Sequence, residues 1–385
     1  MKKWFYKYLL GFVMLLITGL LCAVMWQFGA WAVFFTFLGG IALTAWAVFF
    51  FGVFTGLIYA DRKLIRFTKK LKKQLKEAST IFIMGHAFSD LDSVGASYGL
   101  YYALRDKYDV KMVANKQNTL ARTLVDFLRF SDKECRIYDY EEIKHTVDKN
   151  ALLIVVDTHR PVIMDFRELY DRIDRVVIID HHRKSDDFRD ETIIKYMKST
   201  ASSACEIVTL IIRLLGIDKP ATVAATALLS GIMLDTKNFV MNTGSTTFKC
   251  AAFLRQNRAD PVLIKKMFSE SVEVCKRKYD IVSSVELFEH VAIAKTESQD
   301  EYTRIATAQA ADELLTINGV VASFVMCPSG EEINISARSF GDVDVQKIMA
   351  SLGGGGHKTA AACQIKTKDF QLVEKRLRAA IKEVI

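Results

Sequence analysis

The stretch "VVIIDHHRKS" (residues 176–185) decides the fold, because it joins a uniformly apolar run to a cluster of polar residues. Uniformly apolar, β-branched runs are typical of strands in a parallel sheet that is covered on both faces. Three more runs have this character, namely "TIFIMG" (80–85), "VKMVAN" (110–115) and "ALLIVVD" (151–157). The pattern "DSVGASYGLYYAL" (92–104) indicates a helix after the first of them. The sequence therefore predicts an α/β domain with a parallel sheet.

Two α/β domains are expected. Helical patterns continue the first domain at 203–216, 220–234, 245–257 and 260–287. A second, smaller domain then alternates the strand runs "VAIAKT", "GVVASFVMCP" and "EINISARS" with helical patterns near 308–316, 342–352 and 367–384. We place the boundaries at 1–60 for an apolar segment, 61–79 for a basic helix, 80–287 for the first domain and 288–385 for the second.

The N-terminal segment has the character of a membrane hairpin. It carries no charged residue from Tyr8 to Ala60, and about 20 apolar residues cross a bilayer as a helix. This length predicts two transmembrane helices, at roughly 8–27 and 31–59. A cleaved signal peptide and a buried soluble helix pair are the alternatives, and the second long apolar run argues against a signal peptide.

Positive charge gathers beside this hairpin. The N-terminal flank contributes +3 and residues 61–77 contribute +6 to a net charge of +8, so the rest of the chain is nearly neutral. The positive-inside rule predicts a multi-pass protein of the cell membrane with cytoplasmic catalytic domains. The basic segment is expected to face anionic lipid rather than a long nucleic acid. The seven scattered cysteines form no CxxC pair and are expected to be reduced thiols.

An apolar stripe runs through the basic segment. Leu64, Phe67, Leu71 and Leu75 recur at helical spacing. We interpret them as a helix that leaves the membrane and forms a short dimerising coil, which makes a homodimer a possible partner.

Acidic and imidazole side chains follow the ends of the expected elements. They occur in "MGHAFSDLDSVGAS", at the ends of "ALLIVVD" and "RVVIID", and at the end of the helical pattern "ATALLSGIMLD": His86, Asp90, Asp92, Asp157, Asp180, His181, His182 and Asp235. A single aspartate after a strand is often a helix N-cap, and a single histidine is often structural. Their joint occurrence at element ends, where open α/β sheets assemble their sites, predicts one functional site.

The composition of this set indicates the metal. Carboxylates with a minority of imidazoles and no thiolates suit Mn²⁺ or a similar divalent cation better than a structural Zn²⁺. The aspartates exceed the needs of one ion, which predicts two ions that share a carboxylate. Two-metal sites activate water and stabilise the attacking and leaving oxygens in phosphoester hydrolysis.

In this order, "HAFSDLDSVGA", "VVDTHRP", "IIDHHRKS" and "LLSGIMLDT" resemble the DHH phosphoesterase superfamily, and "GGGGHKTAAACQ" (353–364) resembles the signature of the associated DHHA1 domain. The stretch "INISARSFGDVDVQKIMASLGGGGH" is similar to the membrane-bound cyclic-di-AMP phosphodiesterases of the GdpP type. The resemblance implies two Mn²⁺ ions held by six side chains: His86 and Asp90 on one ion, Asp92, His181 and Asp235 on the other, and Asp157 between them.

The resemblance also implies roles outside the metal ligands. His182 would contact the scissile phosphate, and Asp180 would orient the histidines. In the second domain, Arg338 and the loop of Gly354, Gly355, Gly356 and His357 would hold the nucleotide. Glycines admit the close approach of backbone N–H groups to an anion, and an arginine fork matches phosphate oxygens. Ser202 and Ser203 in "STASSACEIV" are expected to be helix N-caps rather than substrate contacts.

The expected function is therefore hydrolysis of cyclic-di-AMP to 5′-pApA. The alternatives are a nanoRNase or 3′-phosphoadenosine-phosphate phosphatase of the same superfamily, a family II inorganic pyrophosphatase, and a non-catalytic receptor for a cyclic dinucleotide. One departure from the GdpP type is clear, because only about twenty residues separate the expected hairpin from the phosphoesterase. That type places a PAS and a degenerate GGDEF domain there, so no sensing by those domains is expected.

Overall fold

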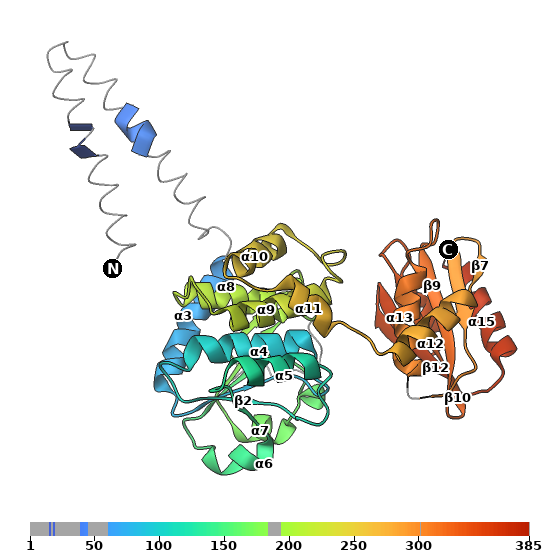
Figure 1. Cartoon of the computed structure of the whole chain (residues 1–385), viewed down its shortest axis with the longest axis horizontal. Coiled ribbons are helices and arrows are strands. Elements are labelled where there is room, and N and C mark those ends of the chain that lie inside the picture. Colours follow the sequence, from blue (N-terminus) through green and yellow to red (C-terminus); the bar gives the residue numbers. More distant parts are fainter. Residues whose placement is uncertain are drawn as a thin grey trace. The chain divides into compact units, whose positions relative to one another are not determined.

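The computed structural model describes residues 15–16, 18–19, 39–44, 61–183, 194–300 and 302–384. The chain divides into two compact units, Met1–Ile264 and Lys265–Ile385 (Figure 1). The transmembrane helices predicted at 8–27 and 31–59 lie almost entirely outside the described residues. Within the described ranges, no helix combines the length and the apolar character that a membrane span needs.

A six-stranded parallel sheet forms the centre of the first unit, in the order β3-β2-β1-β4-β5-β6. Its strands are β1 (Ile81–Met84), β2 (Val110–Val113), β3 (Ile137–Tyr138), β4 (Leu152–Val156), β5 (Val176–Asp180) and β6 (Ile194–Met197). The strand order reverses direction between β1 and β4, which makes their carboxyl ends the topological switch point of the sheet. The four predicted strands are confirmed, and β4 and β5 are buried along their whole length.

Helices cover both faces of this sheet. One face carries α4 (Leu91–Leu104) and α8 (Ala204–Leu214), and α5 (Arg122–Ser131), α9 (Thr222–Asp235) and α10 (Ser245–Gln256) pack on these two helices. The other face carries α6 (Tyr140–Ile143) and α7 (Arg167–Arg172) (Figure 1). Helices α4 and α9 lie very close together, because a Cβ at Gly95 would stand 2.4 Å from the carbonyl oxygen of Ala227. This close packing brings the first turn of α4 to the C-terminal end of α9.

Helix α3 (Arg62–Glu77) packs against the first unit through its apolar stripe. Leu64, Phe67, Leu71 and Leu75 are all at most 4% exposed. The Phe67 ring lies 5.6 Å from the ring of Tyr196 on β6. The predicted dimerising coil is therefore wrong, since the stripe is covered inside the chain. A homodimer stays a prediction without that support.

The second unit contains a mixed sheet in the order β11-β12-β10-β9-β8-β7, in which only β8 and β9 pair in parallel. Its strands are β7 (Glu286–Phe288), β8 (Val291–Lys295), β9 (Ala322–Ser329), β10 (Glu332–Ser339), β11 (Gly355–His357) and β12 (Ala360–Ile365). Helices α14 (Val345–Ser351) and α15 (Phe370–Lys382) cover one face. Helices α12 (Val272–Ser283) and α13 (Thr303–Leu314) pack on the other.

The helical pattern at 260–287 is divided in the structure. It forms α11 (Pro261–Met267), α12 and the edge strand β7. The Ser271 side chain accepts a hydrogen bond from the Val274 N–H and starts α12 as its N-cap. Helix α12 belongs to the second compact unit, whereas the boundary expected from the sequence lies after 287.

The packing of α3 leads to a stability prediction. Leu71→Ala should lower the free energy of unfolding of the first unit by about 2–5 kcal/mol, because it removes a fully buried side chain and leaves a cavity. Denaturant unfolding of the full chain measures this change. Lys69→Ala is the matched control, because Lys69 is exposed on the same helix and its loss should cost less than about 0.5 kcal/mol. Equal stability of the two variants would contradict the packing.

Candidate active site

The first polar cluster lies at the carboxyl end of β1. The Nδ1–H of His86 donates to the Ala87 carbonyl at 2.8 Å, which turns Nε2 inward. This Nε2 lies 3.2 Å from Asp157 Oδ2 and 3.9 Å from Asp90 Oδ1. Asp90 is also the N-cap of α4, with Oδ1 accepting from the N–H groups of Asp92 and Ser93. Asp90 therefore caps the helix and also lies in the predicted cluster, so the two predictions for it are compatible.

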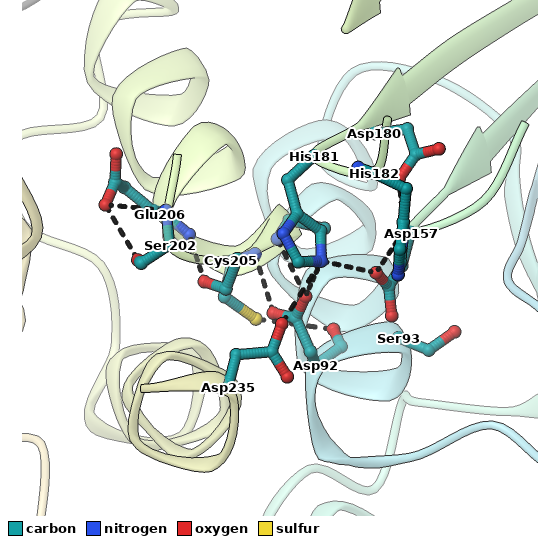
Figure 2. A network of polar contacts seen from close by, with 12 residues as sticks. Asp92, Ser93, Asp157, Asp180, His181, His182, Ser202, Cys205, Glu206 and Asp235 are labelled. Atoms are coloured by element: carbon teal, nitrogen blue, oxygen red, sulfur yellow. Dashed lines mark hydrogen bonds and ion pairs between the residues drawn. The ribbon is translucent and has the colours of Figure 1, made fainter. Parts of the chain in front are cut away.

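A second cluster surrounds the imidazole of His181. Its Nε2 lies 3.2 Å from Asp157 Oδ1, 3.1 Å from Asp235 Oδ2 and 3.9 Å from Asp92 Oδ2. Figure 2 shows the ring of His181 pointing between these carboxylates, which come from β4, α9 and α4. Three segments far apart in the sequence thus meet at one nitrogen atom.

Asp157 belongs to both clusters. Its Oδ2 faces His86 and its Oδ1 faces His181, while the side chain is only 3% exposed. Directly after β4 its backbone takes a φ of 61°, a left-handed conformation that costs a residue other than glycine free energy. The backbone strain therefore coincides with the residue whose two oxygens face two different clusters.

Asp92 is held by the beginning of helix α8. Its two carboxylate oxygens accept from the N–H groups of Ala204 at 2.7 Å and Cys205 at 2.8 Å. Unpaired N–H groups and the positive end of the helix dipole stabilise a carboxylate at this position. The carboxylate is fully buried, and Gly231 of α9 leaves the space for it, since a Cβ there would stand 2.7 Å from Asp92 Cα.

Asp180 contacts imidazoles without joining the two clusters. One oxygen accepts from His182 Nδ1 at 2.8 Å and from the His182 N–H at 3.1 Å, and the other pairs with His159 Nδ1. The prediction had Asp180 orient both residues of the histidine pair, but its partners are His182 and His159. The buried His159 was missed, although the sequence "VVDTHRP" displays it two residues after Asp157.

The carboxylates in this pocket are electrostatically crowded. Burial, followed by the charges of Asp157 and Asp235, raises the pKa of Asp90 to about 6 and raises the pKa of Asp92 well above its usual value. Burial opposes the charging of His181, but Asp157 and Asp235 outweigh it and raise its pKa to about 12. Burial likewise opposes ionisation of Asp157, and the facing imidazoles of His181 and His86 prevail and lower its pKa. The site therefore strongly favours a positive charge at its centre.

Two atoms at this centre fit a bound metal. Asp157 Oδ1 and His181 Nε2 are buried and make no hydrogen bond to any described residue. The ligand atoms within each of three sets lie within 4.8 Å of one another, and these sets are His86 with Asp90 and Asp157, Asp92 with His181 and Asp235, and Asp157 with His181 and His182. The structure thus brings all six predicted metal ligands together, and they form candidate metal-binding clusters.

The serines before α8 support the helix rather than the clusters. Ser203 is the N-cap, with its Oγ accepting from the Glu206 N–H at 3.0 Å. Ser202 Oγ donates to Glu206 Oε2 at 2.7 Å, and Thr247 of α10 donates to the same oxygen at 2.6 Å. This buried network ties the beginning of α8 to α10 through Thr247. Figure 2 shows its contact between Ser202 and Glu206. The network fixes the two N–H groups that hold Asp92.

The second unit places its predicted ligand residues on β10 and β11, the two strands that flank β12. Arg338 of β10 and His357 of β11 are both registered opposite Ala360 of β12. Arg338 Nε lies 3.2 Å from Asp312 Oδ1, so an acidic partner holds the guanidinium. Most of the predicted glycine loop is strand β11, which pairs with β12. A glycine is required sterically at 354, where a Cβ would stand 2.2 Å from the Ala362 carbonyl oxygen, but not at 355, where a Cβ has open space.

Comparisons with known proteins agree with this architecture. The model of the "DHH family, N-terminal domain" matches residues 80–232, and that of the "DHHA1 domain" matches residues 288–385. The chain therefore contains a domain that matches the DHH family, followed by a domain that matches DHHA1.

Named relatives are similar over most of this chain. The cyclic-di-AMP phosphodiesterase GdpP of Geobacillus thermodenitrificans is 39% identical over 81% of this chain and 48% of its own length. The cyclic-di-AMP phosphodiesterase PdeA of Listeria monocytogenes is 34% identical over 82% of this chain and 49% of its own length. The chain spans about half the length of these curated relatives. An exopolyphosphatase-related protein from Bacteroides fragilis shares the fold, with a TM-score of 0.69 and 21% identity over 83% of this chain and 96% of its own.

The contact between α4 and α9 leads to a prediction on metal binding. Gly231→Ala should weaken Mn²⁺ binding by about tenfold or more, because the new Cβ would push Asp92 and Cys205 out of position. Isothermal titration with Mn²⁺ measures the affinity. Gly244→Ala is the control, because no atom lies within 4 Å of its new Cβ. An affinity equal to that of the wild type would show that Asp92 does not depend on this packing.

Two neighbouring glycines of the second unit, Gly355 and Gly356, lead to a prediction about thermal stability. Gly356→Ala should lower the melting temperature, because Gly356 has a φ of 142° and its Cβ would stand 2.5 Å from Ala361 Cα. Gly355→Ala should leave it within about one degree, because its Cβ would have open space. Thermal unfolding of both variants measures the two melting temperatures. A larger loss for Gly355→Ala than for Gly356→Ala would contradict the described backbone of β11.

Proposed function

We propose that this chain is a membrane-anchored, Mn²⁺-dependent phosphodiesterase that hydrolyses cyclic-di-AMP to 5′-pApA. The observation that carries the proposal is Asp157, whose two oxygens face two separate Asp/His clusters. Such a shared carboxylate suits a pair of divalent cations, and clusters of this kind serve phosphoester hydrolysis. The identity to GdpP and PdeA over about four fifths of the chain supports the choice of substrate.

In this proposal His86, Asp90 and Asp157 would hold one Mn²⁺, and Asp92, His181 and Asp235 would hold the other together with Asp157. A bound pair supplies an activated water and neutralises charge on the phosphate. The water oxygen bonds to phosphorus, the bond from phosphorus to the 3′ oxygen breaks, and the 3′ oxygen takes up a proton. One such cleavage opens the ring and leaves the linear dinucleotide.

The remaining residues position the substrate. Burial opposes protonation of His182, but Asp180, which accepts from its Nδ1–H, raises the pKa of the ring. The imidazolium form carries an Nε2–H that donates to a phosphate oxygen in this proposal. Arg338 and the loop of Gly354, Gly355, Gly356 and His357 bind the nucleotide in the second unit. Asp312 contacts Arg338 through Nε, and the terminal N–H groups of the guanidinium donate to a phosphate in this proposal.

The membrane part of the proposal has support from the sequence. An uncharged N-terminal segment followed by a basic one favours a hairpin with both ends on the cytoplasmic side. The catalytic units then face the cytoplasm, where a cyclic dinucleotide would be the partner.

The decisive experiment incubates the purified chain with Mn²⁺ and cyclic-di-AMP and identifies products by mass spectrometry. We expect 5′-pApA as the product, and we expect Asp157→Asn to reduce kcat by about 10³-fold or more, because it removes charge from both clusters at once. His145→Asn is a suitable control, since His145 lies in a short turn outside the clusters. Rapid degradation of pApA with no attack on the cyclic substrate would instead assign the chain to the nanoRNases.

A further inference from the structure

A cavity of about 720 Å³ lies beside the candidate active site, between α3 and the edge strand β6. Apolar and aromatic walls come from Phe67, Ile194, Tyr196 and Met197, and Ser199 adds a hydroxyl. The remaining wall residue is His182, which also belongs to the set of Asp157, His181 and His182. One imidazole therefore separates this cavity from the metal-binding clusters.

Among the described residues that line this cavity, four are cations and none is a carboxylate. Lys63, Arg66 and Lys70 come from α3, and Lys195 comes from β6. The spacing of three and four residues places the α3 cations on one stripe of the helix, where like charges repel each other. The nearest carboxylate of α3, Asp61, is already engaged by the Tyr196 hydroxyl at 2.9 Å and Lys198 at 3.2 Å. The described part of the lining thus concentrates positive charge, and an anion would relieve it.

The orientation of His182 links the two sites. Asp180 fixes its Nδ1, and Asp180 itself is fully buried. The end of β5 pairs with the end of β6, with Asp180 registered opposite Met197. Met197 of the cavity wall therefore lies beside the end of β5 that carries the histidine, and α3 with its three cations packs against the same edge strand. A ligand with two phosphates would meet both the cations and the histidine.

We propose that the cavity between α3 and β6 binds the second, non-reacting phosphate of a dinucleotide while the first phosphate lies at the metal clusters. This inference rests on the proposed function for the identity of the ligand and extends it to a subsite that the basic helix supplies. A phosphate subsite gives a role to the three cations of α3 that line the cavity, Lys63, Arg66 and Lys70. The subsite favours substrates with two phosphates over simple phosphodiesters.

A comparison of two substrates tests this subsite in the full chain with Mn²⁺. The double variant Arg66→Gln with Lys70→Gln should lower the ratio of kcat/KM for cyclic-di-AMP to kcat/KM for bis(p-nitrophenyl) phosphate by about tenfold, mainly through KM. Bis(p-nitrophenyl) phosphate has a single phosphate and reports on the metal clusters alone. The matched control is Lys69→Gln with Lys76→Gln, which removes two cations of the same helix that do not line the cavity. An unchanged ratio, or an equal fall in the control, would overturn the proposal.

A binding measurement separates this inference from the proposed function. Inorganic pyrophosphate is titrated calorimetrically into the full chain after removal of metal by EDTA, and we expect the cavity variant to bind it about tenfold more weakly than the wild type. This result does not depend on which dinucleotide is hydrolysed. Absence of pyrophosphate binding to the wild type, or equal affinity of wild type and variant, would refute the subsite. Loss of binding to phosphatidylglycerol vesicles with an unchanged substrate ratio would assign these cations to lipid and would also refute it.

Discussion

The structure of the site depends on the carboxylate of Asp157, which stands between two imidazoles. Its oxygens lie 3.2 Å from His86 on one side and 3.2 Å from His181 on the other. To reach this position the backbone leaves β4 with a positive φ, a conformation that only a tightly packed surrounding can enforce. That surrounding is the switch point of the parallel sheet, where β1 and β4 end side by side.

Four carboxylates in one buried pocket are unfavourable by themselves, and the fold offsets their repulsion with separate devices. Asp92 takes two N–H groups from the start of α8, and Asp90 takes two from the start of α4. The imidazoles of His86 and His181 face the other two carboxylates, Asp157 and Asp235. These devices reduce the electrostatic cost without removing it, since the pKa values of Asp92 and Asp235 stay raised, first by burial and then by neighbouring carboxylates. A divalent cation completes the balance better than protons do, because it can face several carboxylates at once.

The meeting of these acidic and imidazole side chains was predictable from the sequence, because chemistry and topology agree in their positions. Each ligand follows a strongly apolar strand or ends a helical pattern, so the position of the element also gives the position of the residue. His159 was not predictable in this way, since a single histidine two residues beyond Asp157 has the pattern of a structural residue, and only the fold brings it to Asp180. Strand β12 was missed because its alanines lack the β-branched character of the other strands. Helix α3 was predicted as a helix, but its apolar stripe has the same spacing whether it meets a second copy or the side of a sheet.

Helix α3 shows how one segment can have two faces with different uses. The leucines of α3 are buried beside β6, at the edge of the sheet. At the C-terminal end of α3, Arg175 donates to the Gln74 side chain and to the Glu77 carbonyl. Such anchoring makes the helix part of the rigid unit, so the positions of its cations are set by the same packing that sets β5 and β6. A freely moving basic segment would spread its charge over the surface and contribute only a diffuse, salt-screened attraction. Fixed cations beside a cavity act at short range, where a phosphate can meet several of them together, and this difference makes the orientation of α3 a property of the active site rather than of a linker.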